Sequence, residues 1–185
     1  LVFNLVEPVQ EPYCEMSIPG KIEAENYDKG GSGVAYYDVD SENKGGAYRT
    51  DGVDIEGSAT DGYAVGYTDA GEWLEYTVNV GTSGTFNWTA RVSMGGDSAS
   101  FHLTIDGKDS TKSVTVPGTG NWSIYETVSG GTVDLTKGKH IIRLTIDNPY
   151  ANFDWLEFSD KTTGIPQALS LSTDKVYEYQ IFDLR

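Results

Sequence analysis

Hydrophobic and polar residues alternate along several short stretches of this chain. In residues 72–80, EWLEYTVNV, the side chains of Leu74, Tyr76 and Val78 fall on one face and Glu75 falls on the other. Successive side chains of a β-strand point to opposite faces, so this period of two is typical of a strand buried on one side. Three further stretches repeat it: residues 85–93, 100–107 and 140–147. The pattern predicts short strands, each with one buried face.

Turn-forming residues separate these stretches. Clusters rich in Gly, Pro, Asp and Ser occupy residues 81–84, 106–107 and 117–120. A strand about every ten residues, with no helical period between, predicts an all-β domain built as a sandwich of two antiparallel sheets. The alternation assigns four large aromatic side chains to its core: Tyr76, Phe86, Trp88 and Phe101.

The pattern also divides the chain. Residues 1–17 have no sustained period and contain two prolines, so they are predicted to be a linker or the tail of a preceding domain. The alternating stretches fill residues 18–160, which predicts one domain. Residues 161–185 begin with KTTGIPQ and are predicted to be a linker and the start of a C-terminal segment. Because the chain begins without Met, we expect a module of a longer protein.

Charge and composition exclude several functions. The chain has 28 acidic and 13 basic residues and a formal net charge of −15, which argues against binding to nucleic acid or an anionic membrane. No run approaches the roughly 20 apolar residues of a membrane span. With one cysteine and two histidines, neither an intrachain disulfide nor a structural zinc site is expected. Neutral ligands and cations remain as the expected binding partners.

Six segments carry a family resemblance. They are IEAENYD, GVAYYDVD, GGAYRTDGVDIE, GYAVGYTDAGEWLEYTVNV, VPGTGNW and ANFDWLEF, in this order. Together they resemble carbohydrate-binding module family 6 over residues 18–160. The resemblance implies a β-sandwich of jelly-roll type and a non-catalytic module that binds polysaccharide.

The first of these segments poses an electrostatic problem. In an extended strand Glu23 and Glu25 share a face, and two like charges side by side repel each other. The resemblance implies a structural calcium ion held by Glu23, Glu25 and Asp154, with backbone carbonyls around residues 44–46 completing the shell; calcium prefers such oxygen ligands. The alternative is a solvated acidic face. A second cation at Asp51 and Asp54 also stays open.

The resemblance further implies where a sugar binds. Family members hold a sugar between aromatic rings from two loops and bond it with an Asn, and here these positions fall on Tyr36 or Tyr37, on Trp122 and on Asn152. Neighbouring residues of an extended segment alternate, so only one of the two tyrosines is expected to face the ligand, and Tyr36 is preferred. A second site on the sheet face around Trp73 stays open.

The expected function is to anchor a covalently linked, secreted or cell-surface polysaccharide-degrading enzyme on plant cell-wall polysaccharide, with the module itself a monomer. Xylan or a related hemicellulose is the first choice of ligand; cellulose, β-1,3-glucan and agar-type chains are alternatives. A different class is also open, a small jelly-roll glycoside hydrolase using Glu72, Glu75 or Glu126. A purely structural spacer is the third possibility.

Overall fold

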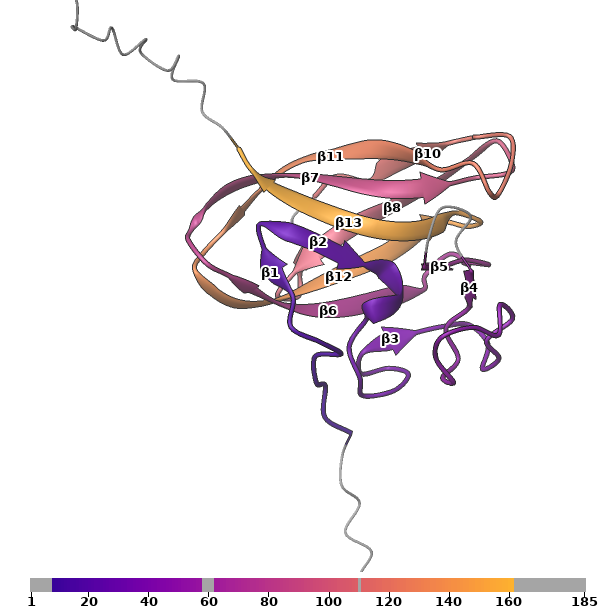
Figure 1. Cartoon of the computed structure of the whole chain (residues 1–185), viewed down its shortest axis with the longest axis horizontal. Coiled ribbons are helices and arrows are strands. Elements are labelled where there is room, and N and C mark those ends of the chain that lie inside the picture. The colour runs from indigo at the N-terminus through magenta and orange to yellow at the C-terminus, as the bar shows by residue number, and fades with distance from the viewer. Residues whose placement is uncertain (1–7, 58–61, 110, 162–185) are drawn as a thin grey trace, which may run out of the picture.

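The chain folds into two β-sheets packed face to face, as Figure 1 shows. The computed structural model describes residues 8–57, 62–109 and 111–161. One sheet contains β1 (Ser17–Ile18), β3 (Tyr36–Tyr37), β6 (Trp73–Val80), β8 (Ser98–Ile105), β9 (Lys108–Asp109), β10 (Val114–Pro117) and β12 (Gly138–Asn148). The other contains β2 (Gly20–Glu23), β4 (Ile55–Gly57), β5 (Tyr63–Val65), β7 (Gly84–Ser93), β11 (Glu126–Leu135) and β13 (Asn152–Asp160). The predicted all-β sandwich of jelly-roll type is confirmed.

Long strands form the centre of each sheet, and the long strand β11 forms one edge of the second sheet. The first sheet has the order β1-β6-β12-β8-β10, and the second has the order β11-β7-β13-β5-β4, with β2 also on β13. A single turn of 3-10 helix, Ala24–Asn26, follows β2. Strands that are adjacent in a sheet are therefore often distant in sequence, which brings residues of the loops to one end of the sandwich.

The hydrophobic core lies between the sheets, where the alternation placed it. Tyr76, Trp88 and Phe101 are fully buried and Phe86 nearly so. The rings of Trp88 and Phe101 meet edge to face with centroids 5.9 Å apart, the geometry that aromatic quadrupoles favour. All four predicted core aromatics are confirmed.

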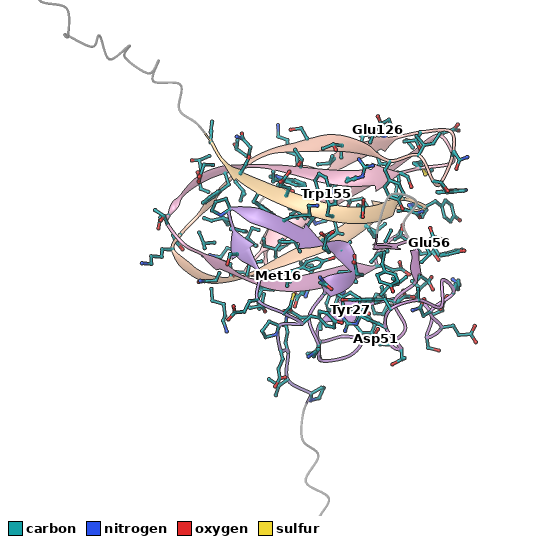
Figure 2. The ribbon with its side chains drawn as sticks, in the orientation of Figure 1. Met16, Tyr27, Asp51, Glu56, Glu126 and Trp155 are labelled. Carbon is teal, nitrogen blue, oxygen red and sulfur yellow. The ribbon has the colours of Figure 1, made fainter. Side chains whose placement is uncertain are left out.

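The segment before β2 belongs to the fold, which corrects the prediction of a linker over residues 1–17. Met16 is buried in the core and is labelled in Figure 2, and β1 pairs in parallel with the edge of β6. Further upstream, the backbones of Glu11 and Lys29 exchange two hydrogen bonds of 2.9 and 2.7 Å. This segment is held by one buried apolar side chain, that of Met16, and by main-chain hydrogen bonds to distant segments. Neither feature produces an alternating pattern in the local sequence, so the pattern could not predict it. Residues 1–7 lie outside the described part.

At the other end, β13 ends at Asp160, and the backbone N–H of Lys161 donates to the carbonyl of Thr85 at 3.1 Å. The predicted C-terminal segment beyond residue 161 lies outside the described residues. Within the described ranges, the structure contains no helix with the length and hydrophobicity needed to cross a membrane.

A β-bulge interrupts β13 at Asp154. Phe153 pairs with Val92 and Trp155 pairs with Arg91, so Asp154 is an extra residue without a partner of its own on β7. A bulge of this kind redirects the side chain of the inserted residue. Phe153 and Leu156 remain in the core, and Asp154 points away from it into a separate acidic pocket described below.

Candidate functional site

Loops at the end of the sandwich near β4 and β5 enclose a cleft of about 280 Å³. We call it the loop-end cleft and define it by its lining residues: Glu56, Tyr67, Trp122, Tyr150 and Asn152. Figure 2 shows Glu56 at this end of the molecule. Three of the five lining side chains are aromatic and exposed by about half, Tyr67 at 50%, Trp122 at 46% and Tyr150 at 56%. The cleft therefore offers apolar ring surfaces to solvent.

Trp122 is held in place by contacts with Ser93, at the end of β7, and with Gly95. The hydroxyl of Ser93, at the end of β7, donates to the Trp122 carbonyl at 2.6 Å. The indole lies directly against Gly95, where an added Cβ would come within 2.4 Å of Trp122 Cε2. A real Cβ does not approach that closely, so only glycine lets the ring lie flat there. Trp122 thus has one covered face and a substantial exposed surface.

Tyr67 and Tyr150 are presented by two loops that are tied together. Both have left-handed backbone conformations, with φ of 50° and 76°, which are uncommon for residues other than glycine. Thr68 joins the loops: its carbonyl accepts from the backbone of Tyr150 at 2.8 Å, and its hydroxyl donates to the carbonyl of Ala151 at 2.8 Å. Because Thr68 is buried, this connection is shielded from water.

The polar side of the cleft is an amide and a carboxylate. Asn152 Nδ2 donates to Glu56 Oε1 at 2.8 Å. Gly66 makes room for the pair, since a Cβ there would lie 2.9 Å from Asn152 Oδ1 and 3.4 Å from Glu56 Oε1. Burial raises the pKa of the Glu56 carboxyl, and the bond from Asn152 opposes that shift. An amide and a carboxylate side by side can accept and donate hydrogen bonds to adjacent hydroxyl groups.

The structure divides the four predicted sugar-site residues. Trp122 and Asn152 lie together in the loop-end cleft. The preference for Tyr36 is wrong, because its ring is buried in the core, edge-on to Tyr27, and its hydroxyl accepts from the Gly52 backbone at 3.2 Å. Tyr37 is the exposed member of the pair, as alternation requires, but it pairs with Trp73 and does not line the cleft.

Sequence reasoning missed Glu56, Tyr67 and Tyr150. The signal for the tyrosines was present: both are aromatic residues between strands, next to turn-forming Gly66 and Pro149, where no core position is expected. Nothing local marked Glu56, which lies in β4 and reaches the cleft only because β4 pairs with β5 beside β13.

The three predicted metal ligands line one pocket of about 460 Å³, which we call the acidic pocket. Its lining is Lys21, Glu23, Glu25, Gly62, Arg91, Asp154 and Trp155. Residues 44–46, expected to supply carbonyl ligands, are not among them. Burial, and then the charges of Glu23 and Asp154, raise the pKa of Glu25 to about 7. These carboxylates therefore repel each other, but not for the predicted reason: β2 ends at Glu23 and Glu25 lies in the following 3-10 turn, so the two do not share the face of one extended strand.

The donor set suits a hard cation. Glu25 Oε2 is buried and has no hydrogen-bond partner among the described residues, which is costly for a carboxylate oxygen. Asp154 Oδ2 accepts from Arg91 Nε at 3.1 Å, so a guanidinium supplies part of the counter-charge. Carboxylate oxygens are the ligands that calcium prefers, so the chemistry of Glu23, Glu25 and Asp154 suits that ion, although their oxygens do not form a group within 4.8 Å of one another.

A different acidic group is more tightly clustered. Carboxylate oxygens of Asp38, Asp40 and Asp54 lie within 4.8 Å of one another, the one such group in the described ranges. The ammonium of Lys44 lies 2.5 Å from Asp40 and 3.7 Å from Asp54, so the cluster has its own counter-ion. Asp51 is not part of it.

Asp51 instead pairs with Arg49. The two form an ion pair of 2.9 Å. The guanidinium also packs on the Tyr27 ring, with its carbon 3.6 Å from the ring centroid. The two carboxylates considered for a second cation, Asp51 and Asp54, therefore have separate basic partners.

Trp73 on the open face of the first sheet is covered. The guanidinium carbon of Arg143 lies 3.9 Å from the Trp73 ring centroid, and Glu75 holds that guanidinium with contacts of 2.8 and 2.7 Å. Glu72 is occupied as well, since it accepts from the backbones of Val39 and Asp69 at 3.2 and 2.8 Å. Neither Glu72, Glu75 nor Glu126 lines the loop-end cleft.

An antiparallel β-sandwich whose loops enclose a small cleft with aromatic walls and one amide–carboxylate pair has the features of a small-ligand binding module. The sequence profile described as "Carbohydrate binding module (family 6)" matches residues 23–160. The chain belongs to this family of non-catalytic carbohydrate-binding modules.

Solved structures agree with the fold. The C-terminal family 6 module of LamC, a marine laminarinase from Zobellia galactanivorans, is 26% identical with a TM-score of 0.60, over 76% of this chain and 98% of that one. The module CsCBM6-3 from Clostridium stercorarium, solved with cellobiose, is 24% identical with a TM-score of 0.62, over 80% and 98%. A β-1,3-glucan-binding family 6 module from Bacillus halodurans is 22% identical with a TM-score of 0.55, over 78% and 98%. A comparison with curated proteins gave no match.

Proposed function

We propose that the loop-end cleft is the saccharide-binding site of this module. The observation that carries the proposal is the juxtaposition of a flat indole, Trp122, with the hydrogen-bonding pair Asn152 and Glu56 in one cleft. A pyranose ring has an apolar C–H face and a rim of hydroxyl groups, so it can stack on the indole while its rim reaches the amide and the carboxylate. Tyr67 and Tyr150 supply further apolar wall.

The proposed ligand is a neutral β-linked polysaccharide. The partly buried carboxylate of Glu56 and the net charge of −15 disfavour anionic chains. Xylan stays the first candidate from the sequence. β-1,3-Glucan is the second candidate, supported by the neighbours from Zobellia galactanivorans and Bacillus halodurans, which are described as part of a laminarinase and as β-1,3-glucan-binding.

Affinity gel electrophoresis on xylan, laminarin, cellulose derivative and an anionic polygalacturonate tests this proposal. We expect retardation by at least one neutral β-linked polymer, with none by polygalacturonate, and loss of retardation in Asn152→Ala. Retention by none of the neutral polymers, or retention that is insensitive to Asn152→Ala, would overturn the assignment. Release of reducing ends from a retained polymer would instead support the hydrolase alternative.

We also propose that Glu23, Glu25 and Asp154 hold a structural calcium ion. The orphaned oxygen of Glu25 and the gathering of three carboxylates around one pocket support it, because a divalent cation would satisfy the first and offset the charge of the second. The ion would connect β2 and its following turn to β13. Adding calcium to EDTA-treated protein is expected to raise the melting temperature, and Glu25→Gln is expected to abolish most of that rise.

Attachment to a secreted or cell-surface polysaccharide-degrading enzyme is the proposed setting for the module. A modest saccharide affinity becomes useful there, because holding an enzyme on an insoluble substrate raises its local concentration. Fusing the module to a xylanase or a β-1,3-glucanase and measuring release from insoluble against soluble substrate tests this role. A gain confined to the insoluble substrate is expected, and an equal rate on both would contradict it.

A further inference from the structure

Thr68 lies behind the loop-end cleft and joins the two loops that carry its tyrosines. It is 3% exposed and does not line the cleft. It directly follows Tyr67 in the sequence, and it bonds to the segment of Tyr150 and Ala151, although Thr68 and Ala151 are 83 positions apart. A residue in this place cannot touch a ligand in the cleft, but it can act on the ligand through the tyrosines.

The two hydrogen bonds of Thr68 enclose the backbone of Tyr150. The N–H of Tyr150 donates to the Thr68 carbonyl at 2.8 Å, and the Thr68 hydroxyl donates to the Ala151 carbonyl at 2.8 Å. One bond therefore fixes the chain before the Cα atom of Tyr150, and the other fixes it after the next residue. Opening the second bond would leave the carbonyl of Ala151, a buried residue, without its partner, which is unfavourable.

This backbone has to be held in place because it is strained. Tyr67 has a φ of 50° and Tyr150 has a φ of 76°, and a left-handed conformation is an outlier for a bulky residue. Among the described residues, four that are not glycine have a positive φ, and two of the four are these cleft tyrosines. Strain of this kind persists only where neighbouring contacts enforce it, and it is often found at ligand-binding sites.

The loop of Tyr67 is also held on its other side. The N–H of Gly66 donates to the carbonyl of Asp54 at 3.0 Å, so both sequence neighbours of Tyr67 are bonded to other segments. At the base of the same two loops, the N–H of Gly71 donates to the carbonyl of Ile146 at 2.8 Å. That bond holds the loops together near the sheet, and the bonds of Thr68 hold them together at the level of the tyrosines.

We propose that Thr68 is a positioning residue of the saccharide site, and that its hydroxyl fixes the ring of Tyr150 relative to that of Tyr67 before a ligand arrives. Rings that are already in place spare the ligand the entropy cost of ordering them, so the fixed arrangement raises affinity. This inference rests on the proposed function of the loop-end cleft. It predicts that affinity falls when the Thr68 hydroxyl is removed, although every side chain that lines the cleft is unchanged.

Three variants test the hydroxyl. Thr68→Val removes it and keeps the branched shape of the side chain, and we expect the affinity for an oligosaccharide to fall about fivefold, the ordering cost of about one side chain. Thr68→Ser restores the donor and should bind within about twofold of the wild type. Thr77→Val is the matched control, because it removes a hydroxyl that donates to Asp28 Oδ2 at 2.5 Å and does not line the cleft. This control should lower the melting temperature and leave affinity unchanged.

A double-mutant cycle tests whether Thr68 acts through Tyr150. Tyr150→Ala removes the ring that the Thr68 hydroxyl is proposed to fix. Adding Thr68→Val to Tyr150→Ala should therefore weaken binding by less than about twofold, so the two losses are not additive. Titration calorimetry with an oligosaccharide of the retained polymer measures all four proteins. A further fivefold loss in the Tyr150→Ala background would overturn the proposal.

Amide hydrogen exchange followed by NMR tests the geometry without any saccharide. The amide of Tyr150 is bonded to the Thr68 carbonyl, so it should be protected in the wild type, in Thr68→Ser and in Thr77→Val. In Thr68→Val this amide should exchange at least about tenfold faster, because the neighbouring bond to Ala151 no longer holds the loop.

Several results would overturn the role of Thr68. An unprotected Tyr150 amide in the wild type would do so without any variant, which keeps the test valid if Thr68→Val does not fold. Wild-type affinity in Thr68→Val, or an equal loss in Thr77→Val, would do so as well. If the wild type binds no polysaccharide, the proposed function of the cleft fails, and amide exchange alone decides whether Thr68 fixes Tyr150.

Discussion

Two tryptophans of this module, Trp122 at the loop end and Trp73 on the open sheet face, are held in opposite ways. Trp122 rests on Gly95, which has no side chain, and faces a cleft with the other side of its ring. Trp73 is capped by Arg143 at 3.9 Å, and Glu75 fixes that cap. Both were outward-facing candidates from the sequence. An exposed position is therefore not enough for a stacking surface, because what lies against each face of the ring decides whether a ligand can use it.

The comparison is tested most directly by removing each indole. Trp122→Ala is expected to weaken polysaccharide binding at least about tenfold, because the ligand loses an apolar face worth about 1.5–3 kcal/mol when buried. Trp73→Ala is expected to change binding by less than about twofold. Isothermal titration with an oligosaccharide of the retained polymer measures both. A larger loss in Trp73→Ala would reverse the comparison.

The role of Gly95 beneath the Trp122 ring is tested by adding a side chain at that position. Gly95→Ala places a Cβ where it would lie 2.4 Å from Trp122 Cε2, so the indole must shift. We expect an affinity loss of about five- to tenfold from this displacement, as overpacking forces side chains out of position. Gly81→Ala is the control, because nothing lies within 4 Å of its added Cβ and its φ is not in the left-handed range. Equal affinities of the two variants would contradict the role of Gly95.

The polar side of the cleft predicts that polysaccharide binding depends on pH. Burial raises the pKa of Glu56, so it takes up a proton above the usual range of a glutamate as the pH falls. Binding is expected to weaken about threefold between pH 7 and pH 4.5, as a hydrogen bond to a charged acceptor becomes one to a neutral group. Because a raised carboxyl pKa makes the folded state the tighter proton binder, this protonation favours folding, and the loss does not reflect unfolding. Glu56→Gln should bind with a flat pH profile, and a retained slope would implicate another group.

The smallest expected effect comes from uncovering Trp73. Arg143→Ser removes the cap and its ion pair with Glu75, which should lower the free energy of unfolding by about 0.5–1 kcal/mol, since the pair is only partly buried. Polysaccharide affinity should stay within about twofold of the wild type. Urea unfolding and calorimetry provide the two numbers. A marked change in affinity would show that the sheet face takes part in binding.

The features that could be predicted from the sequence are those that depend on local alternation or on short motifs. Alternation alone placed Tyr76, Phe86, Trp88 and Phe101 in the core, and the family motifs placed Trp122 and Asn152, which the fold brings into one cleft. Whether these two residues bind a sugar stays a prediction.

The predictions that failed concern residues whose positions depend on pairing between distant segments. The choice between Tyr36 and Tyr37 is decided by the register of β3 on β6, where Tyr36 faces inward opposite Leu74, and no local pattern specifies that register. Glu56 reaches the cleft only through the order of strands in the second sheet. Residues 8–17 looked like a linker for the same reason, because their partners lie on β6 and at Lys29.

The direction of β13 has a practical consequence for how the module presents itself to a solid surface. Its nine residues begin with Asn152 in the cleft and end with Asp160, and at about 3.4 Å per residue the strand spans nearly the whole length of the sandwich. The described chain leaves at the pole opposite the cleft (Figure 1). A linker or fusion attached at that end leaves the loop-end cleft exposed at the other. The cleft can then contact a solid surface while an attached domain lies on the far side of the module.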